Sequence, residues 1–260
     1  IVLLSMELFY RKYGTGKPLV ILHGLFGSGD NWMTQARMLG EHYAVYAVDL
    51  RNHGSSPHAD KFSYAEMAED VRLFLTEKVG EPAILIGHSM GGKVAMKVAV
   101  MYPDLITRLI VVDIVPKAYP LNHQHIIDAL CAMETEKLSS RQEADEILSK
   151  SVTEPEVRQF LLKNLSRNPA GGFSWKMNLS VIAANRNEIF SDPMHDLFYN
   201  GPVLFVFGSR SDYYQTGDAK KIGLHFPYHQ IEFLETGHWV QAEKPVEFVQ
   251  LVLRSEEHTS

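Results

Sequence analysis

Residues 82–94 read PAILIGHSMGGKV, in which an apolar run leads into Gly87-His88-Ser89-Met90-Gly91 and a helical pattern follows. A Gly-x-Ser-x-Gly sequence between a buried strand and a helix is typical of a nucleophile elbow, a turn tight enough to strain the serine backbone. Both flanks need glycine because a side chain there would collide with the strand or the helix. The positive end of the helix lies beside the raised hydroxyl, where it can steady an oxyanion. A chance glycine–serine loop would not need a buried strand before it and a helix after it. We therefore interpret Ser89 as a nucleophile.

Short apolar runs alternate with helical patterns along most of the chain, which is typical of a largely parallel sheet covered by helices on both faces. Several of the seven expected strands are almost continuously apolar, as strands buried on both faces should be. The expected strands are residues 8–12, 19–22, 43–48, 83–86, 108–112, 203–207 and 230–234, and the expected helices beside them are residues 31–39, 64–78, 91–101, 218–224 and 245–253.

The alternation stops between Ile114 and Gly201, where strand patterns vanish and helical patterns follow one another. An all-helical insert between two strands of a sheet is expected to form a lid over their carboxyl ends. Inside it, the sequence NPAGG at residues 168–172 predicts a turn. We therefore expect a core of residues 6–113 and 201–254 and a helical lid of residues 114–200, with lid helices at 122–133, 141–150, 154–165 and 177–188.

Length and charge narrow the class of protein. The 260 residues suffice for one α/β domain with a sizeable core, and a formal net charge of −6 disfavours nucleic acids and anionic membrane surfaces as partners. No stretch approaches the ~20 apolar residues that span a bilayer. A single cysteine, Cys131, excludes an intramolecular disulfide and favours a reducing compartment, so we predict a cytoplasmic protein. Residues 1–5, before Met6, and residues 255–260 are expected to be tails outside the fold.

The serine hydroxyl needs a base to accept its proton, and the chain offers twelve histidines. His238 follows the last expected strand and precedes the last helix, which is where a doubly wound hydrolase delivers its base in the chain order serine, acid, histidine. His88 lies inside the elbow, and we expect it to orient or pack rather than to abstract the proton. Five other histidines lie in polar sequence contexts, and we expect them to be surface-loop residues rather than the base: His42, His58, His123, His195 and His229.

Two aspartates are candidates for the acid that orients this histidine. In most hydrolases of this architecture the acid comes three residues after the glycine that ends the penultimate strand, here Gly208, but that slot holds Ser211 and Asp212 lies one residue further on. Asp113 follows strand 108–112 and precedes apolar residues, so a buried carboxylate there needs a cationic or hydrogen-bonding partner. A histidine meets that need. Both aspartates remain candidates on these grounds.

The remaining group of a serine hydrolase is an oxyanion hole, a pair of backbone N–H donors. Residues 20–27 read VILHGLFG, a strand that ends in His-Gly and a short loop able to turn an N–H group toward the oxyanion. We expect the donors to be the N–H groups of Leu25 and Met90. Residues 49–56 close the next strand, and their charged and small side chains are expected to brace this loop.

Taken together, these residues resemble the α/β-hydrolase superfamily and, within it, the YbfF-like esterases and their mammalian mitochondrial abhydrolase relatives. The resemblance runs from Met6 to Leu253 and implies an α/β-hydrolase fold, a mostly parallel doubly wound sheet with a helical lid inserted after the sixth strand. It also implies hydrolysis of carboxylic esters or acyl thioesters without a cofactor. In that group serine occupies the usual acid slot and the acid comes from the earlier strand end, which matches Asp113, although Asp212 beside Ser211 is a departure. The matching stretches are residues 23–28, 49–54, 87–93 and 237–245 and, more weakly, 112–116 and 173–179.

The first hypothesis is therefore a serine carboxylesterase in which Ser89 attacks, His238 shuttles the proton, and Asp113 orients the histidine. A C–C hydrolase or a cofactor-free haloperoxidase would use the same groups, and a ligand-binding receptor on the same scaffold is the alternative outside the enzymes. An intact serine, histidine and acid favour an enzyme. The expected partner is a small-molecule acyl ester or thioester, with no metal ion. Acyl chain length, leaving group and oligomeric state do not follow from the sequence.

Overall fold

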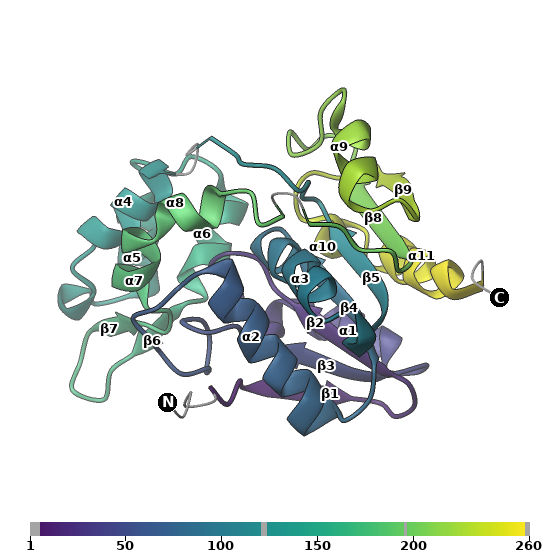
Figure 1. The fold of residues 1–260 in the computed structure, drawn as a ribbon. Coiled ribbons are helices and arrows are strands. Elements are labelled where there is room, and N and C mark those ends of the chain that lie inside the picture. Colours follow the sequence, from purple (N-terminus) through teal and green to yellow (C-terminus); the bar gives the residue numbers. More distant parts are fainter. Residues whose placement is uncertain (1–5, 121–123, 195–196, 258–260) are drawn as a thin grey trace.

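The computed structural model describes residues 6–120, 124–194 and 197–257, and a seven-stranded sheet lies at its centre (Figure 1). The strand order is β1-β3-β2-β4-β5-β8-β9, and all neighbours are parallel except β1, which is antiparallel to β3. The predicted fold class, a mostly parallel α/β sheet, is confirmed. The strands are β1 (Tyr10–Tyr13), β2 (Pro18–Leu22), β3 (Ala44–Val48), β4 (Ala83–His88), β5 (Ile106–Val112), β8 (Val203–Gly208) and β9 (His229–Leu234).

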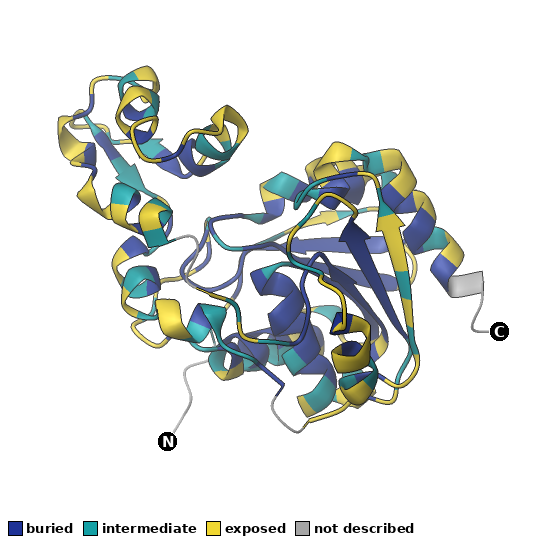
Figure 2. Ribbon diagram, turned by 90° about the horizontal axis from the view of Figure 1, so that it is seen from above, coloured by how far each residue is buried: buried dark blue, intermediate teal, exposed yellow. Residues whose placement is uncertain are grey.

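Helices cover both faces of the sheet because the inner strands point apolar side chains to either side. In β2, Leu19 and Ile21 share a buried cluster with residues of α1 and α11, whereas Val20 and Leu22 share another with residues of α2 and α3. Burial on both faces explains the continuous apolar runs of these strands, which are dark blue in Figure 2. The helices of this core are α1 (Met33–Leu39), α2 (Tyr64–Phe74), α3 (Met90–Met101), α9 (Asp218–His225), α10 (Val240–Glu243) and α11 (Pro245–Glu257).

The segment between β5 and β8, residues 114–200 and hereafter the insert, forms a separate group of short elements beside the sheet (Figure 1). It is not all-helical as predicted, because a two-stranded antiparallel hairpin interrupts it. The predicted turn at residues 168–172 joins the two strands of this hairpin. Its elements are α4 (Gln124–Ala132), α5 (Arg141–Leu148), α6 (Pro155–Leu162), β6 (Leu165–Arg167), β7 (Phe173–Trp175), α7 (Leu179–Ala184) and α8 (Arg186–Phe190).

Two further expectations about the insert need correction. The insert follows β5, the fifth strand, rather than a sixth, because only four strands precede β5 among the described residues. The helix expected at residues 177–188 is two helices, since the chain leaves the helical conformation at Asn185 (φ −106, ψ 20) between α7 and α8. Of the helix expected at residues 122–133, the first two residues lie outside the described residues.

The insert contacts the core at the carboxyl ends of the central strands. Asn164 Nδ2 donates to the carbonyl of Phe26, which follows β2, at 2.8 Å. The N–H of Asn178 donates to the carbonyl of Asn52, which follows β3, at 2.9 Å. These contacts fix the insert over the sheet edge at which the loops after each parallel strand meet, and ligands of open α/β sheets bind at that edge.

Near the carboxyl end of the chain, α11 extends through Glu257, so residues 255–257, expected to lie in a tail, belong to this helix. Ser255 is 4% exposed, and its hydroxyl donates to the carbonyl of Val252 at 2.7 Å. Residues 1–5 and 258–260 lie outside the described residues. Within the described ranges, no helix combines the length and apolarity needed to cross a membrane. The cytoplasmic location stays a prediction.

Candidate active site

Ser89 occupies the turn between β4 and α3, with φ 52 and ψ −120. This left-handed backbone is strained for a serine, as a nucleophile elbow requires. The flanking glycines are required by contact: a Cβ on Gly87 would lie 2.2 Å from the carbonyl oxygen of Gly91, and one on Gly91 would lie 2.4 Å from that of His23. The N–H of Ser89 donates to the carbonyl of Val112 at 3.0 Å, which ties the elbow to the end of β5.

Asp113 lies at that end of β5, fully buried and also in a left-handed conformation (φ 51). Its Oδ2 accepts a hydrogen bond from His238 Nδ1 at 2.7 Å and another from the Ser211 hydroxyl at 2.5 Å. Its Oδ1 accepts from the N–H of Gly208 at 2.9 Å. A buried carboxylate is costly unless it is paired and hydrogen-bonded, and these three donors satisfy that need.

His238 lies between β9 and α10, and its side chain is 26% exposed. Because Nδ1 faces Asp113, the proton on this nitrogen points at the carboxylate and Nε2 is left as the basic atom. The imidazole ring lies 4.7 Å, centroid to centroid, from the ring of His88, the residue before Ser89. The structure therefore brings the predicted base and acid into direct contact beside the elbow.

His88 contacts the base through its ring, and its expected role, to orient or pack rather than to abstract the proton, stays a prediction. It is buried, and its Nε2 hydrogen-bonds the backbone carbonyl of His238 at 2.9 Å, so this nitrogen carries the proton. Burial lowers the pKa of His88 well below its ordinary value, and the nearby His238 lowers that pKa further. A neutral His88 is therefore fixed between the elbow and the backbone of the base.

Asp212 is not placed to orient His238. Its side chain is exposed, and among the described residues the carboxylate in contact with the imidazole is that of Asp113. Arg210, two residues before Asp212, pairs through Nη2 with Glu243 at 3.0 Å.

The two predicted oxyanion donors, the N–H groups of Leu25 and Met90, have no protein acceptor within the described residues. Leu25 lies in the turn after β2, which is closed by a 2.9 Å hydrogen bond from the N–H of Gly27 to the carbonyl of Gly24. Met90 is the first residue of α3, where an N–H has no acceptor within the helix. Neither N–H donates to a carbonyl or side chain in the described part of the chain. Both are available for an anion formed above Ser89.

His23 fixes the base of the oxyanion loop. Its Nδ1 donates to the carbonyl of Gly24 at 2.8 Å, and its Nε2 accepts from the N–H of Leu50 at 3.0 Å. These two bonds require the neutral ring, which agrees with burial lowering the pKa of His23 to about 4. The segment of residues 49–56, expected to brace this loop with its side chains, contacts it here through the backbone N–H of Leu50.

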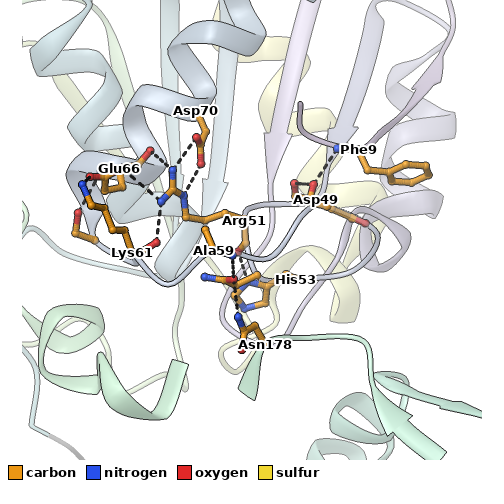
Figure 3. A network of polar contacts seen from close by, with 12 residues as sticks. Phe9, Asp49, Arg51, His53, Ala59, Lys61, Glu66, Asp70 and Asn178 are labelled. Carbon is orange, nitrogen blue, oxygen red and sulfur yellow. Dashed lines mark hydrogen bonds and ion pairs between the residues drawn. The ribbon is translucent and has the colours of Figure 1, made fainter. Parts of the chain in front are cut away.

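A buried ion pair holds the bracing segment in turn (Figure 3). Arg51 binds Asp70 of α2 with both ends of its guanidinium, at 2.5 and 2.8 Å. Burial raises the pKa of Asp70, and the hydrogen bond and charge of Arg51 oppose that rise. Asp49 accepts from the N–H groups of Gly29 and Ser55 at 2.6 and 2.8 Å, so the segments after β2 and β3 are linked.

Lys93 is a structural residue that the sequence did not single out. This α3 residue is 2% exposed, and its Nζ donates to the carbonyl of Ser191 in the insert at 2.5 Å. The amine also lies over the rings of Tyr119 and Tyr64, at 5.0 and 5.6 Å. Burial lowers the pKa of Lys93 to about 7. The sequence signal for its burial was its position one helical turn after Ser89 in the expected helix.

Tyr213 was also missed by the sequence analysis. Its ring is stacked on that of His238, with centroids 4.1 Å apart and an interplanar angle of 16°. On the other rim of the site, Trp239 contacts Phe160 of α6, with ring centroids 5.5 Å apart. The described residues contain no group of three or more histidine, cysteine, aspartate or glutamate side chains arranged to hold a metal ion.

Comparison with known proteins agrees with the observed fold. The family model described as the alpha/beta hydrolase fold matches residues 17–245. The chain belongs to this family.

Among relatives of this α/β hydrolase, a Xenopus laevis protein named sn-1-specific diacylglycerol lipase ABHD11 is 40% identical over 259 residues, with 95% of this chain and 83% of the relative covered. Esterase YbfF of Escherichia coli is 34% identical over 230 residues, with 88% of each protein covered. A solved structure named marine microorganism esterase has a TM-score of 0.93 and 41% identity, with 96% of this chain and 99% of that chain covered. These similar proteins are named esterases and lipases, which are hydrolases that act on ester bonds.

Proposed function

We propose that this α/β hydrolase is a serine carboxylesterase that cleaves carboxylic esters, or acyl thioesters, through an acyl-enzyme. The observation that carries the proposal is the 2.7 Å hydrogen bond from His238 Nδ1 to the buried carboxylate of Asp113, beside the Ser89 elbow. Hydrolysis of ester bonds by the named relatives supports the same reaction type.

In the acylation step, His238 Nε2 accepts the hydroxyl proton of Ser89 while the serine oxygen bonds to the substrate carbonyl carbon. The carbonyl oxygen becomes an oxyanion, and the N–H groups of Leu25 and Met90 donate to it. His238 then gives its proton to the leaving alcohol or thiol as the bond to the acyl carbon breaks. Asp113 keeps its charge throughout and stabilises the imidazolium form of the histidine.

Deacylation repeats these steps with water as the nucleophile. His238 accepts a proton from water, the new oxygen bonds to the acyl carbon, and the Ser89 oxygen leaves with that proton. One ester and one water thus give one acid and one alcohol, with no change in oxidation state and no cofactor.

In this proposal the insert is a lid that shapes the acyl site. Its contacts with the loops after β2 and β3 support a position over the catalytic edge. Phe160 of α6 supplies an apolar surface beside Trp239, the residue next to the base. A pocket with an apolar wall and a few fixed polar groups suits a small-molecule acyl ester.

The proposal is tested with p-nitrophenyl esters of increasing acyl length and with the Ser89→Ala variant. We expect the wild type to release p-nitrophenol and the variant to lose about 10⁶ in kcat, since removal of a triad serine abolishes the covalent route. The thermal unfolding midpoint should not fall, because the change removes one oxygen. Retention of more than about a hundredth of the wild-type kcat by the folded variant would exclude the covalent mechanism.

A further inference from the structure

One aromatic side chain contacts the base without taking part in the proton transfers proposed above. Tyr213 lies in the loop between β8 and α9, two residues after Ser211. Its ring is nearly parallel to the imidazole of His238, at 16° and 4.1 Å between centroids. The ring of His88 is tilted by 43° to the same imidazole at 4.7 Å, so Tyr213 makes the closer and better aligned stack.

The main chain of Tyr213 is held on both sides. Its N–H donates to the Ser211 hydroxyl oxygen at 3.3 Å, and its carbonyl accepts from the Tyr119 hydroxyl at 2.9 Å. That Tyr119 oxygen in turn accepts from the N–H of Val115 at 2.9 Å. The loop is therefore fixed to the same chain segment that begins at Asp113.

An ion pair fixes the far end of the same loop. Lys117 pairs with Asp218, the first residue of α9, at 2.5 Å, and both side chains are largely buried. The Asp218 carboxylate also accepts from the N–H of Gln215 at 2.9 Å. Residues 211–218 thus form a rigid support for the tyrosine ring, and a catalytic side chain is held most exactly by neighbours that are themselves fixed.

A stacked phenol has two physical effects on a catalytic imidazole. The Asp113 bond fixes one ring nitrogen but leaves rotation about the axis through that bond, and a parallel ring restricts this rotation. The electron-rich face of the phenol also attracts a cation more than a neutral ring, so it favours the imidazolium that forms during each proton transfer. Burial, with a smaller contribution from the charge of Asp113, raises the pKa of Tyr213 to about 12, so the phenol stays neutral.

We propose that Tyr213 is a positioning residue for catalysis, which holds the His238 imidazole in its productive plane and stabilises its protonated form. This inference rests on the proposed function for its kinetic consequence. In the described residues, the titratable groups that face the imidazole are Asp113 after β5, His88 at the end of β4 and Tyr213 itself. Next to His238, Trp239 contacts Phe160 of the insert, and neither of these two side chains carries a charge.

The test compares Tyr213→Leu, which removes the ring, with Tyr213→Phe, which keeps the stack and removes only the hydroxyl. We expect Tyr213→Leu to lower kcat for p-nitrophenyl acetate about tenfold with KM changed less than about twofold, because a slightly misplaced base affects the chemical step more than binding. The acid limb of its kcat/KM profile should move about 0.5 to 1 pH unit lower, the direction expected when the imidazolium loses a cation–π partner. Tyr213→Phe should match the wild type within about twofold in both respects.

Tyr214→Leu is the matched control, because the ring of Tyr214 packs against Phe207 at 4.7 Å and makes no ring contact with His238. It should leave the pH profile unchanged. A wild-type pH profile in Tyr213→Leu, or equal losses in Tyr213→Phe and Tyr213→Leu, would overturn the inference.

NMR titration of the His238 ring, assigned by its absence in His238→Gln, separates this inference from the proposed function. Its midpoint should fall in Tyr213→Leu and not in Tyr213→Phe, whether or not esters are turned over. Wild-type protein that cleaves no ester contradicts the proposed function, whereas an unchanged midpoint contradicts the role of Tyr213. Circular dichroism checks folding, and Tyr213→Met supplies a second ring-free variant if Tyr213→Leu does not fold.

Discussion

The carboxyl edge of the sheet and the insert that covers it are held together in different ways. At the edge, Asp113 and Arg51 are buried and each has at least three hydrogen bonds. The insert consists of helices of five to nine residues and one hairpin of three-residue strands. It meets the core through a shared apolar cluster and through scattered hydrogen bonds, such as the two between Asn178 and Asn52 at 2.9 and 3.2 Å. The contrast predicts that substitutions at the edge change the chemistry more than substitutions in the insert do.

The largest effect expected from this comparison distinguishes a carboxylate fixed at the edge from one on an exposed loop. Asp113→Asn should lose about 10⁴ in kcat, because the amide favours the wrong histidine tautomer. Asp212→Asn removes the same charge from an exposed side chain and should stay within about twofold, in line with ordinary surface substitutions. Steady-state kinetics of both variants with circular dichroism provides the measurement. A larger loss in Asp212→Asn would assign the acid to the loop after β8.

The next effect concerns the buried histidines behind the edge. Burial lowers the pKa of His23 to about 4 and that of His53 to about 3. In the unfolded chain the histidine pKa lies near 6.5. At a pH between 6.5 and the lowered pKa of the folded chain, the unfolded chain therefore binds more protons than the folded one. The stabilisation that is present above pH 6.5 is lost as the pH falls through this range. Each histidine should cost about 2 kcal/mol of the free energy of unfolding at pH 5 relative to neutral pH.

Urea unfolding at pH 7, 6 and 5 measures this loss. His53→Gln should flatten the pH dependence, and His58→Gln, at an exposed position, should leave it as in the wild type. Equal stability of the wild type at pH 7 and pH 5 would contradict the neutral, buried state of these rings.

The smallest expected effect concerns the insert. Phe160→Ala removes the contact with Trp239, and an aromatic pair contributes about 0.5–1.5 kcal/mol beyond its burial. We expect a roughly threefold to tenfold loss of kcat/KM for long acyl esters and little change for acetate, whose acyl chain is a single methyl group. Ile147→Ala, at an exposed position of α5, is the control. Equal losses for short and long esters would place Phe160 outside the acyl site.

The sheet and two members of the site could be predicted because their signals are local. The apolar runs of β2, β4 and β5 reflect burial on both faces, and the residues around Ser89 and His238 carry turn requirements that few sequences meet. The acid was harder, because Asp113 and Asp212 both follow strands and a shift of one residue in a loop does not show in the sequence. Burial and three donors at Asp113 are properties of the folded chain.

The features missed by the sequence analysis depend on contacts between distant segments. Strands of three residues, such as β6 and β7, are too short to show a period, and they form where the chain turns back at Gly171 and Gly172 (φ 100 and 69). Tyr213 lies in a loop with no pattern, and its contact with His238 appears only when the loop after β8 is folded against the one after β9.

Four non-glycine residues in the described chain have positive φ, and each follows a central strand: Phe26 after β2, Asn52 after β3, Ser89 after β4 and Asp113 after β5. Such conformations cost about 1–3 kcal/mol each for most residues, and glycine relieves that cost. Selection for heat resistance alone would therefore favour glycine at the positions of Ser89 and Asp113, which the proposed mechanism needs for turnover. A screen for thermostable variants must therefore measure turnover at the same time. Otherwise the most thermostable variants that it selects will include inactive proteins.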